Sequence, residues 1–232
     1  MVKKKCLIIL GGSSGIGKEI INKIQNRYNI CALYNKNKPI LKKNAKILQL
    51  DLNTNLSNLK EILGPILKNN KNFVLINFAA VKIDKISLFI NDNEFDYTVN
   101  VNIKSFLKII QFILPKMMKN NWGRIINISS SGGLKGDKGT ALYSLSKSAT
   151  QAMMKVMSQE YGKFNITFNT IKLGNFNYGL FKVLDKKLKR KIIQKIPSNK
   201  TGNISNILSA LYFLIDADYV NGSTIDVDGG MN

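Results

Sequence analysis

Tyr143 and Lys147 stand four residues apart in a stretch with a helical pattern, so both side chains project from one helix face. The apolar positions that continue this pattern are Ala149, Met153, Met154 and Met157. A free tyrosine has a pKa of about 10 and donates its proton poorly at neutral pH, whereas a nearby ammonium favours the phenolate and lowers that pKa. The spacing therefore predicts that Tyr143 acts as a general acid beside Lys147.

A hydroxyl group precedes this pair in the chain. An apolar run typical of a buried strand ends in three serines and two glycines; its members are Ile125, Ile126 and Ile128. Ser130 lies at the carboxyl end of this run, thirteen residues before Tyr143. We expect the strand to present the Ser130 hydroxyl at its carboxyl end.

A glycine-rich stretch, GGSSGIG at residues 11–17, follows the first apolar run, Cys6 to Leu10, and leads into a helical pattern. Glycine lets the backbone turn tightly and approach a pyrophosphate, and the free N–H groups at a helix start face the anion. A glycine-rich turn between a strand and a helix therefore indicates a nucleotide-binding site.

The second predicted strand, Ile30 to Tyr34, is followed by Asn35, Lys36, Asn37 and Lys38. An acidic side chain at this point binds the ribose hydroxyls of NAD, whereas a basic one suits the extra phosphate of NADP. The sequence therefore favours NADP(H) over NAD(H), with Asn35 and Lys36 as contacts. The alternative is that these are ordinary lysines of a turn.

The composition narrows the chemistry further. The chain has no histidine, which excludes histidine-based triads, metal sites and general bases. With 232 residues and 44% hydrophobic content, it predicts one domain spanning 1–232. The two cysteines, Cys6 and Cys31, fall in predicted strands and are interpreted as small buried hydrophobes, which fits a reducing cytoplasm.

The N-terminal stretch MVKKKCLIIL is interpreted as a first strand and not as a signal peptide, because its apolar run is short and breaks into glycines. No window approaches the roughly 20 apolar residues of a membrane helix. The formal charge of +21 has two explanations, a surface for an acidic partner or a compositional drift toward lysine and asparagine. The lysines are dispersed and not interleaved with aromatics, so we expect neither a specific nucleic-acid partner nor a membrane.

In order and spacing these motifs resemble the short-chain dehydrogenase/reductase family, and most closely the branch of the 3-oxoacyl-acyl carrier protein reductases. The resemblance covers nearly the whole chain and implies an α/β fold: a Rossmann-type, doubly wound, mostly parallel seven-stranded sheet with helices on both faces. Gly11, Gly15 and Gly17 match the three fixed glycines of the family, and the terminal Asp228-Gly229-Gly230 matches the reductase branch. Leu10 stands where a threonine is usual.

The resemblance assigns roles to four catalytic residues. Tyr143 would donate a proton to the developing alkoxide, and Ser130 would hydrogen-bond the carbonyl oxygen of the substrate. Lys147 would bind the nicotinamide ribose and lower the tyrosine pKa. Asn102 would hold a helix kink and a water for proton relay.

The resemblance also implies a set of cofactor contacts. Besides the catalytic Tyr143 and Lys147 and the residues after the second strand, these are Gly11, Ser13, Ser14, Gly15, Ile16, Gly17, Asp51, Leu52, Phe78, Ala79 and Phe176. Asp51 and Leu52, from the third strand (Lys46 to Leu52), would lie against the adenine, and Phe176 near the nicotinamide carboxamide. The family helix between the second and third strands is predicted to be shortened or lost. Three departures from the family, Phe78, Ala80 and Leu173, lie beside the expected cofactor path.

Two further regions have alternative interpretations. Residues 175–200 correspond to a substrate lid, and their DKKLKRK stretch is either a docking surface for acidic acyl carrier protein or a solvated helix face. The predicted helix from Lys104 to Met118 and the helix after Tyr143 either form the face through which family members dimerise or tetramerise, or simply cover the sheet.

The function implied is NADPH-dependent reduction of 3-oxoacyl-acyl carrier protein to the 3-hydroxyacyl form by hydride transfer, as in fatty acid biosynthesis. A second enzyme hypothesis is a reductase or dehydrogenase of a sugar or other small ketone or alcohol, because one scaffold serves many substrates. From another class, the chain is a catalytically idle scaffold of the same fold.

Overall fold

The computed structural model describes residues 4–13, 15–40, 45–54, 56–132, 136–178, 181 and 184–231. Within them one seven-stranded sheet runs in the order β3-β2-β1-β4-β5-β6-β7, and every neighbouring pair is parallel. The strands are β1 (Cys6–Leu10), β2 (Asn29–Tyr34), β3 (Ala45–Gln49), β4 (Phe73–Asn77), β5 (Gly123–Ser130), β6 (Ile166–Leu173) and β7 (Thr224–Val227). The predicted doubly wound sheet is confirmed.

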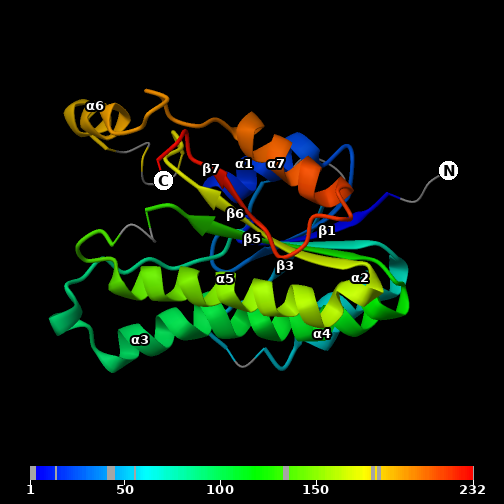
Figure 1. The fold of residues 1–232 in the computed structure, drawn as a ribbon. Coiled ribbons are helices and arrows are strands. Elements are labelled where there is room, and N and C mark those ends of the chain that lie inside the picture. The colour runs from blue at the N-terminus through cyan, green and yellow to red at the C-terminus, as the bar shows by residue number, and fades with distance from the viewer. Residues whose placement is uncertain are drawn as a thin grey trace.

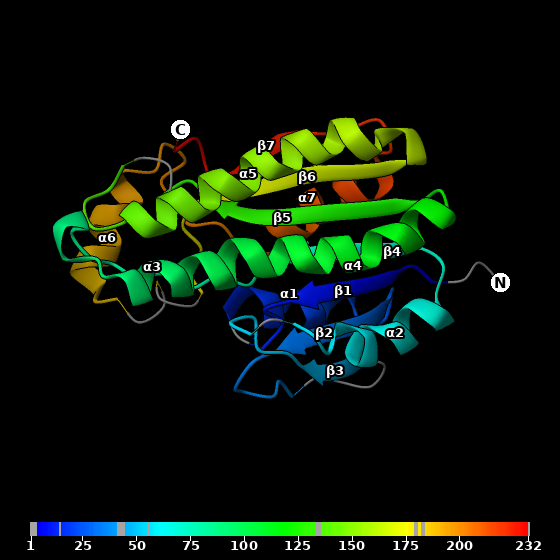
Figure 2. The same ribbon diagram turned by 90° about the horizontal axis from the view of Figure 1, so that it is seen from below.

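Helices cover both faces of this sheet (Figure 1). One face carries α2 (Leu59–Asn69), α3 (Asp92–Val99), α4 (Ser105–Lys119) and α5 (Ala141–Tyr161), and the other carries α1 (Gly15–Ile24) and α7 (Ile204–Asp216). Figure 2 looks onto the first face, where α4 and α5 lie lengthwise along the strands. The helix α6 (Lys186–Gln194) lies beyond the carboxyl ends of the strands.

The core has two layers, one on each side of the sheet. Along β1 the side chains alternate: Cys6, Ile8 and Leu10 pack under α2, α4 and α5, whereas Leu7 and Ile9 pack under α1 and α7. All five are buried. A parallel strand buried on both faces needs such a continuous apolar run, which is why the sequence of β1 carries no polar alternation.

The connection between β2 and β3 is short. Residues 35–40 contain no helix, as expected for this chain, and residues 41–44 lie outside the described part. The strand β3 begins at Ala45 and ends at Gln49, earlier than the predicted end at Leu52, because the chain turns at residues 51–54, where Asp51 accepts a hydrogen bond from the Asn53 amide (2.9 Å).

A π turn, η2 (Asn100–Lys104), joins α3 to α4, so the long helix on this face changes its winding at Asn102. The helix kink implied by the resemblance is therefore present. Its α4 part covers nearly the predicted range, and β6 ends one residue before the predicted Gly174.

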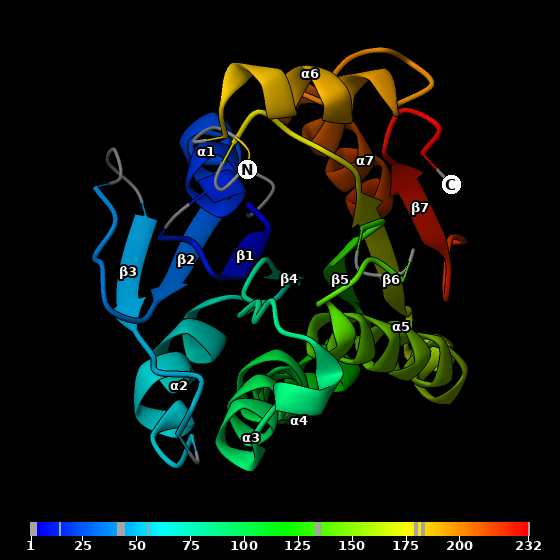
Figure 3. The same ribbon diagram turned by 90° about the vertical axis from the view of Figure 1, so that its left-hand side faces the viewer.

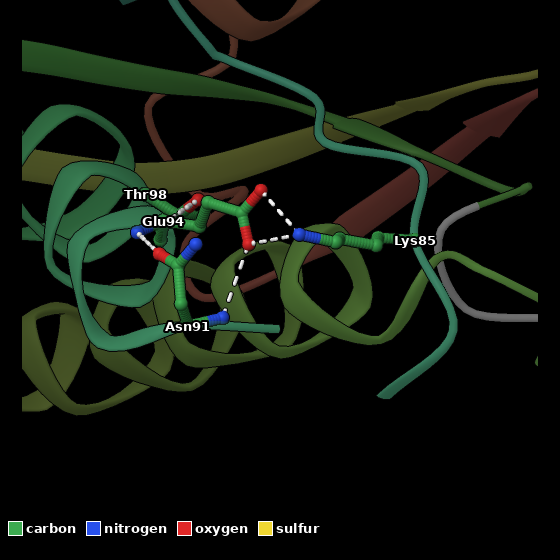
Figure 4. Close-up of polar contacts among 4 residues, drawn as sticks. All are labelled: Lys85, Asn91, Glu94 and Thr98. Atoms are coloured by element: carbon green, nitrogen blue, oxygen red, sulfur yellow. Dashed lines mark hydrogen bonds and ion pairs between the residues drawn. The ribbon is translucent and has the colours of Figure 1, made fainter. Parts of the chain in front are cut away.

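The start of α3 is fixed by a polar cluster (Figure 4). Asn91 and Glu94 form a reciprocal capping box, and the Lys85 ammonium lies 2.9 Å from both carboxylate oxygens of Glu94. The Lys85 amide also donates to the carbonyl of Gly139 (2.8 Å), just before α5. The cluster thus ties the segment after β4 to both α3 and the N-terminal end of α5.

No helix in the described ranges is long and apolar enough to cross a membrane. Across the same residues, no group of three or more histidine, cysteine or acidic side chains is arranged to hold a metal ion.

Candidate active site

The order of the strands reverses between β1 and β4, and a cavity of about 480 Å³ opens there at the carboxyl ends of the strands. Figure 3 views the molecule from the side of these carboxyl ends. Loops that leave neighbouring parallel strands in opposite directions create a crevice at this point, where open α/β sheets bind their ligands. The cavity is within the size range of small-molecule sites.

The structure brings Ser130, Tyr143 and Lys147 together in the wall of this cavity. The first turns of α5 place Tyr143 and Lys147 on one face, with the Lys147 ammonium 5.6 Å from the centre of the phenol ring. Ser130, the last residue of β5, shares a side-chain hydrogen bond with Tyr143. Lys147 is buried and donates to the backbone carbonyl of Ile128 (2.7 Å), which holds its ammonium against β5.

The electrostatics of this cluster differ from the prediction. Burial raises the pKa of Tyr143 above its ordinary value; the hydrogen bond with Ser130 lowers it in part, and the Asp84 carboxylate raises it further. The expected lowering by Lys147 is therefore wrong for this structure. The physical reason is desolvation, which also lowers the pKa of Lys147 itself to about 8. Tyr143 accordingly keeps its proton, the form that a proton donor needs, throughout the neutral range.

Asn102 lies behind the cavity wall and not in it. Its buried side chain accepts a hydrogen bond from the amide of Val81 (2.8 Å) and donates to the carbonyl of Val81 (2.9 Å). The π turn is therefore hydrogen-bonded to the backbone of the segment that follows β4. These hydrogen bonds position the residues around Val81, which line the cavity.

The glycine-rich turn forms the wall beside β1. Gly11, Ser13, Gly15, Ile16 and Gly17 all line the cavity, and Ser14 lies outside the described residues. Gly11 has a φ of +73°, and a Cβ there would stand 2.7 Å from the Ala79 nitrogen; Gly15 has a φ of +54° with open space where a side chain would be. Only glycine permits both the turn and this open path to the helix start.

Of the four residues expected on the adenosine side, three line the cavity. Asn35, Asp51 and Leu52 line the cavity, and the Asn35 amide lies 3.4 Å from the Asp51 carboxylate. Lys36 is exposed and does not line the wall.

On the nicotinamide side, Phe78, Ala79 and Ala80 line the cavity, whereas Phe176 does not. Phe176 is buried in the core, where its backbone bridges to Gly202 and its ring packs against that glycine. Leu173, Gly174 and Tyr178 line the wall where Phe176 was expected. Leu10, the departure from the usual threonine, is fully buried at the end of β1 and also reaches the wall.

Sequence reasoning missed several wall residues, which come from separate parts of the chain: Leu33, Tyr34, Leu50, Val81, Lys82, Tyr97, Val101, Ile128, Ser129 and Tyr178. The residues at the ends of β2 and β5 could have been predicted, because parallel strands bring their last residues to the same side of the sheet as Leu10. Tyr97 and Lys82 could not, since the packing of α3 and of the segment after β4 places them there.

With the geometry established, comparisons with known proteins are informative. The family described as short chain dehydrogenase matches residues 5–189. Two curated relatives are named 3-oxoacyl-[acyl-carrier-protein] reductase FabG: one from Rickettsia felis is 32% identical, covering 98% of this chain and 96% of its own, and one from Buchnera aphidicola is 30% identical, covering 99% and 98%.

Solved structures agree with the fold. ElxO with NADP bound superimposes with a TM-score of 0.87 at 26% identity, and 4-hydroxyisoleucine dehydrogenase complexed with NADH with 0.90 at 26% identity; each alignment covers 98% of both chains. The cavity of this chain lies at the strand edge where a Rossmann-type sheet takes its ligand. The chain therefore belongs to the short-chain dehydrogenases, a family of oxidoreductases.

Proposed function

We propose that this protein is an NADPH-dependent carbonyl reductase that converts 3-oxoacyl-acyl carrier protein to the 3-hydroxyacyl form. The observation that carries the proposal is the convergence of Ser130, Tyr143 and Lys147 on one cavity that also contains the glycine-rich turn. The curated relatives named as 3-oxoacyl-acyl carrier protein reductases, at 30–32% identity over nearly the full chain, support the choice of substrate.

Residues along the whole cavity would hold a nicotinamide dinucleotide. The turn at residues 11–17 would hold the pyrophosphate at the start of α1, Asn35 and Asp51 the adenosine, and Lys147 the nicotinamide ribose. When bound, the cofactor supplies the hydride. The open space at Gly15 is the feature of this chain that leaves room for the phosphates.

The protein residues then supply the proton and the orientation. Ser130 would donate a hydrogen bond to the substrate carbonyl oxygen, and Tyr143, which keeps its proton because burial raises its pKa, would protonate that oxygen as negative charge develops. Lys147 stays mainly charged below its pKa of about 8 and presents its ammonium beside the phenol. Asn102 would support the proton relay from behind the wall, through the segment around Val81 that its side chain holds.

The preference for NADPH rests on the residues after β2. No acidic side chain stands at positions 35–38, and Lys36 is exposed close to the adenosine end. A flexible lysine on this turn can reach a ribose phosphate from outside the wall. The similar solved structures contain NADP in one case and NADH in another, so the preference of this chain depends on its own residues.

The lid and the assembly complete the proposal. Within a single domain of residues 1–232, the segment 175–200 acts as the lid, and α6 within it carries Lys186, Lys187, Lys189, Arg190 and Lys191. This charge favours an acidic acyl carrier protein as the substrate carrier. A homo-oligomer, dimer or tetramer, would form through α4 and α5; α5 exposes Leu145 and Val156, which a neighbouring copy would cover.

The alternatives are a reductase of a sugar or other small ketone, favoured by the bulk of Phe78 and Tyr178 in the wall, and an idle scaffold. One experiment separates all three: NADPH oxidation followed by absorbance with acetoacetyl-acyl carrier protein, with NADH run in parallel. Fast turnover with NADPH supports the proposal. Tight NADPH binding without turnover would favour a reductase of small ketones. If neither cofactor binds, the idle scaffold is the remaining alternative.

Tyr143→Phe tests the mechanism. The phenol is the proton donor in the proposal, so the variant should lose about 10²–10⁴-fold in kcat while the dissociation constant for NADPH, measured by its own fluorescence, stays unchanged. Activity near that of the wild type would refute the assignment of Tyr143.

A further inference from the structure

Ser146 is completely buried in α5, between Tyr143 and Lys147 along the chain. Its hydroxyl donates to the backbone carbonyl of Tyr143 (2.8 Å). It also accepts a hydrogen bond from the side-chain amide of Asn102 (3.0 Å), which comes from the π turn η2. One hydroxyl thus connects the backbone of the tyrosine to the asparagine of a different helix.

Without Ser146, one N–H of the Asn102 side-chain amide would lack a hydrogen-bond acceptor. Its oxygen accepts from the Val81 amide, and its nitrogen carries two protons, of which one goes to the Val81 carbonyl and the other to Ser146. Because the group is buried, a proton without an acceptor would be costly and would drive the amide to another rotamer. Within the described residues, Ser146 therefore provides the last of the three hydrogen bonds that the Asn102 side chain makes.

The buried face of α5 explains why a polar residue is tolerated here. In the first half of the helix most of the buried residues are polar, with Ser146, Lys147 and Thr150 beside Leu142, and the second half buries Met154 and Met157 beside Ser158. Serine bonding to a carbonyl one turn back usually weakens a helix slightly. The sequence accepts that cost at the turn that carries the tyrosine.

We propose that Ser146 is a positioning residue of the reductase: it locks the Asn102 amide of the π turn and the Tyr143 backbone of α5 into one fixed arrangement. The inference rests on the proposed function, in which Tyr143 donates the proton and Asn102 supports the relay. Ser146 itself touches neither substrate nor cofactor; it acts through these two residues.

The chain offers a matched control. Ser158 lies on the same helix, is also buried, and its hydroxyl makes the same local bond, to the carbonyl of Lys155 (2.7 Å). It stands three turns away, near the C-terminal end of α5, and does not line the cavity. Ser146→Ala and Ser158→Ala therefore remove the same local hydrogen bond, and only the first removes the link to Asn102.

The kinetic test measures both variants with NADPH and acetoacetyl-acyl carrier protein. Ser146→Ala should lower kcat about tenfold while KM and the dissociation constant for NADPH stay within about twofold, and Ser158→Ala should leave kcat unchanged. Combining Ser146→Ala with Asn102→Ala should cost no more in kcat than Asn102→Ala alone, because the two residues act as one unit. Equal kcat in both serine variants, or additive losses in the double variant, would overturn the proposal.

Hydrogen exchange gives a readout that is independent of turnover. The Val81 amide, held by Asn102, should exchange about tenfold faster in Ser146→Ala and at the wild-type rate in Ser158→Ala. Unchanged exchange at Val81 refutes the role of Ser146 whatever the substrate is. If instead Tyr143→Phe proves fully active while Val81 exchange responds as expected, the proposed function fails and the link between Ser146 and Asn102 stands.

Discussion

The two halves of the cavity are built in different ways. On the catalytic side, between β4, β5 and α5, Asn102, Ser146 and Lys147 are buried and held by hydrogen bonds of 2.7–3.0 Å to other elements. On the adenosine side, between β2 and β3, Asn35 and Asp51 meet at 3.4 Å, and Lys36 is exposed. The connection there contains no helix in residues 35–40.

The difference shows where rigidity is needed. Proton transfer requires atoms held in a fixed geometry, and burial also sets the pKa of the groups that exchange the proton. Holding an adenosine through exposed side chains requires much less order. We therefore expect substitutions on the catalytic side to alter stability and kcat together, and substitutions on the adenosine side to alter cofactor affinity alone.

The largest effect is expected for Lys147→Met. Turnover should fall by at least about 10²-fold, because the ammonium beside the phenol is lost. Burial lowers the pKa of Lys147 from 10.5 to about 8, so below pH 8 its charge costs the folded state roughly 3 kcal/mol. The variant should therefore unfold at higher urea concentration than the wild type at pH 7.

The sign of this pH dependence provides the control for Lys147→Met. Between about pH 8 and 10.5 the unfolded chain binds more protons at this site than the folded one, so the wild type gains stability from Lys147 as the pH rises. The variant lacks that gain, and the two unfolding curves should converge toward pH 10.5. A variant less stable than the wild type at pH 7 would contradict the cost assigned to the buried ammonium.

Next in size is a comparison of the same substitution in the two halves. Asn102→Ala leaves the Val81 amide and carbonyl without their partner, which should lower the free energy of unfolding by about 2–4 kcal/mol, together with kcat. Asn35→Ala, at the partly exposed site, should cost less than about 0.5 kcal/mol. Chemical unfolding of both variants checks this; equal losses would mean that the two halves are built alike.

A smaller and more selective effect is expected for Lys36→Glu. Reversing this charge should weaken NADPH binding about tenfold or more and change NADH binding much less, because only NADPH carries the extra phosphate. Fluorescence titration with both cofactors measures the ratio. Lys38→Glu, two residues along the same turn, is the matched control, and an equal loss for NADH would rule out a role of Lys36 in phosphate recognition.

The smallest effect is expected for Glu94→Gln at the start of α3. The hydrogen bond from Lys85 lowers the pKa of Glu94, so this carboxylate contributes stability above its unfolded pKa, and the contribution is lost as the pH falls through the folded value. The glutamine variant should melt slightly below the wild type at pH 7, and this difference should become smaller in acid, as the carboxylate takes up its proton. Glu160→Gln, an exposed position on α5, should melt like the wild type at both.

Residues whose position follows from local pattern were predictable. Tyr143 and Lys147 share a helix face by their spacing, and Ser130 and the glycine turn stand at strand ends, so parallel pairing alone brings them to one edge. Phe176 was not predictable, because its backbone lies in an irregular segment and its ring turns into the core against Gly202. Asn35 lines the cavity and its neighbour Lys36 does not, a difference that distance from a strand end could not predict.

The sequence by itself determined the parallel sheet, the turn that accepts phosphates and the residue types of the catalytic cluster, because strand periodicity, glycine placement and helical spacing are local properties. Only the tertiary structure decided the electrostatics and the support of that cluster. Burial is a property of the whole fold, so the raised pKa of Tyr143 and the lowered pKa of Lys147 became visible only with α5 packed on the sheet. The link from Asn102 through Ser146 to Tyr143 joins residues 44 positions apart, and folding alone brings them within hydrogen-bond distance.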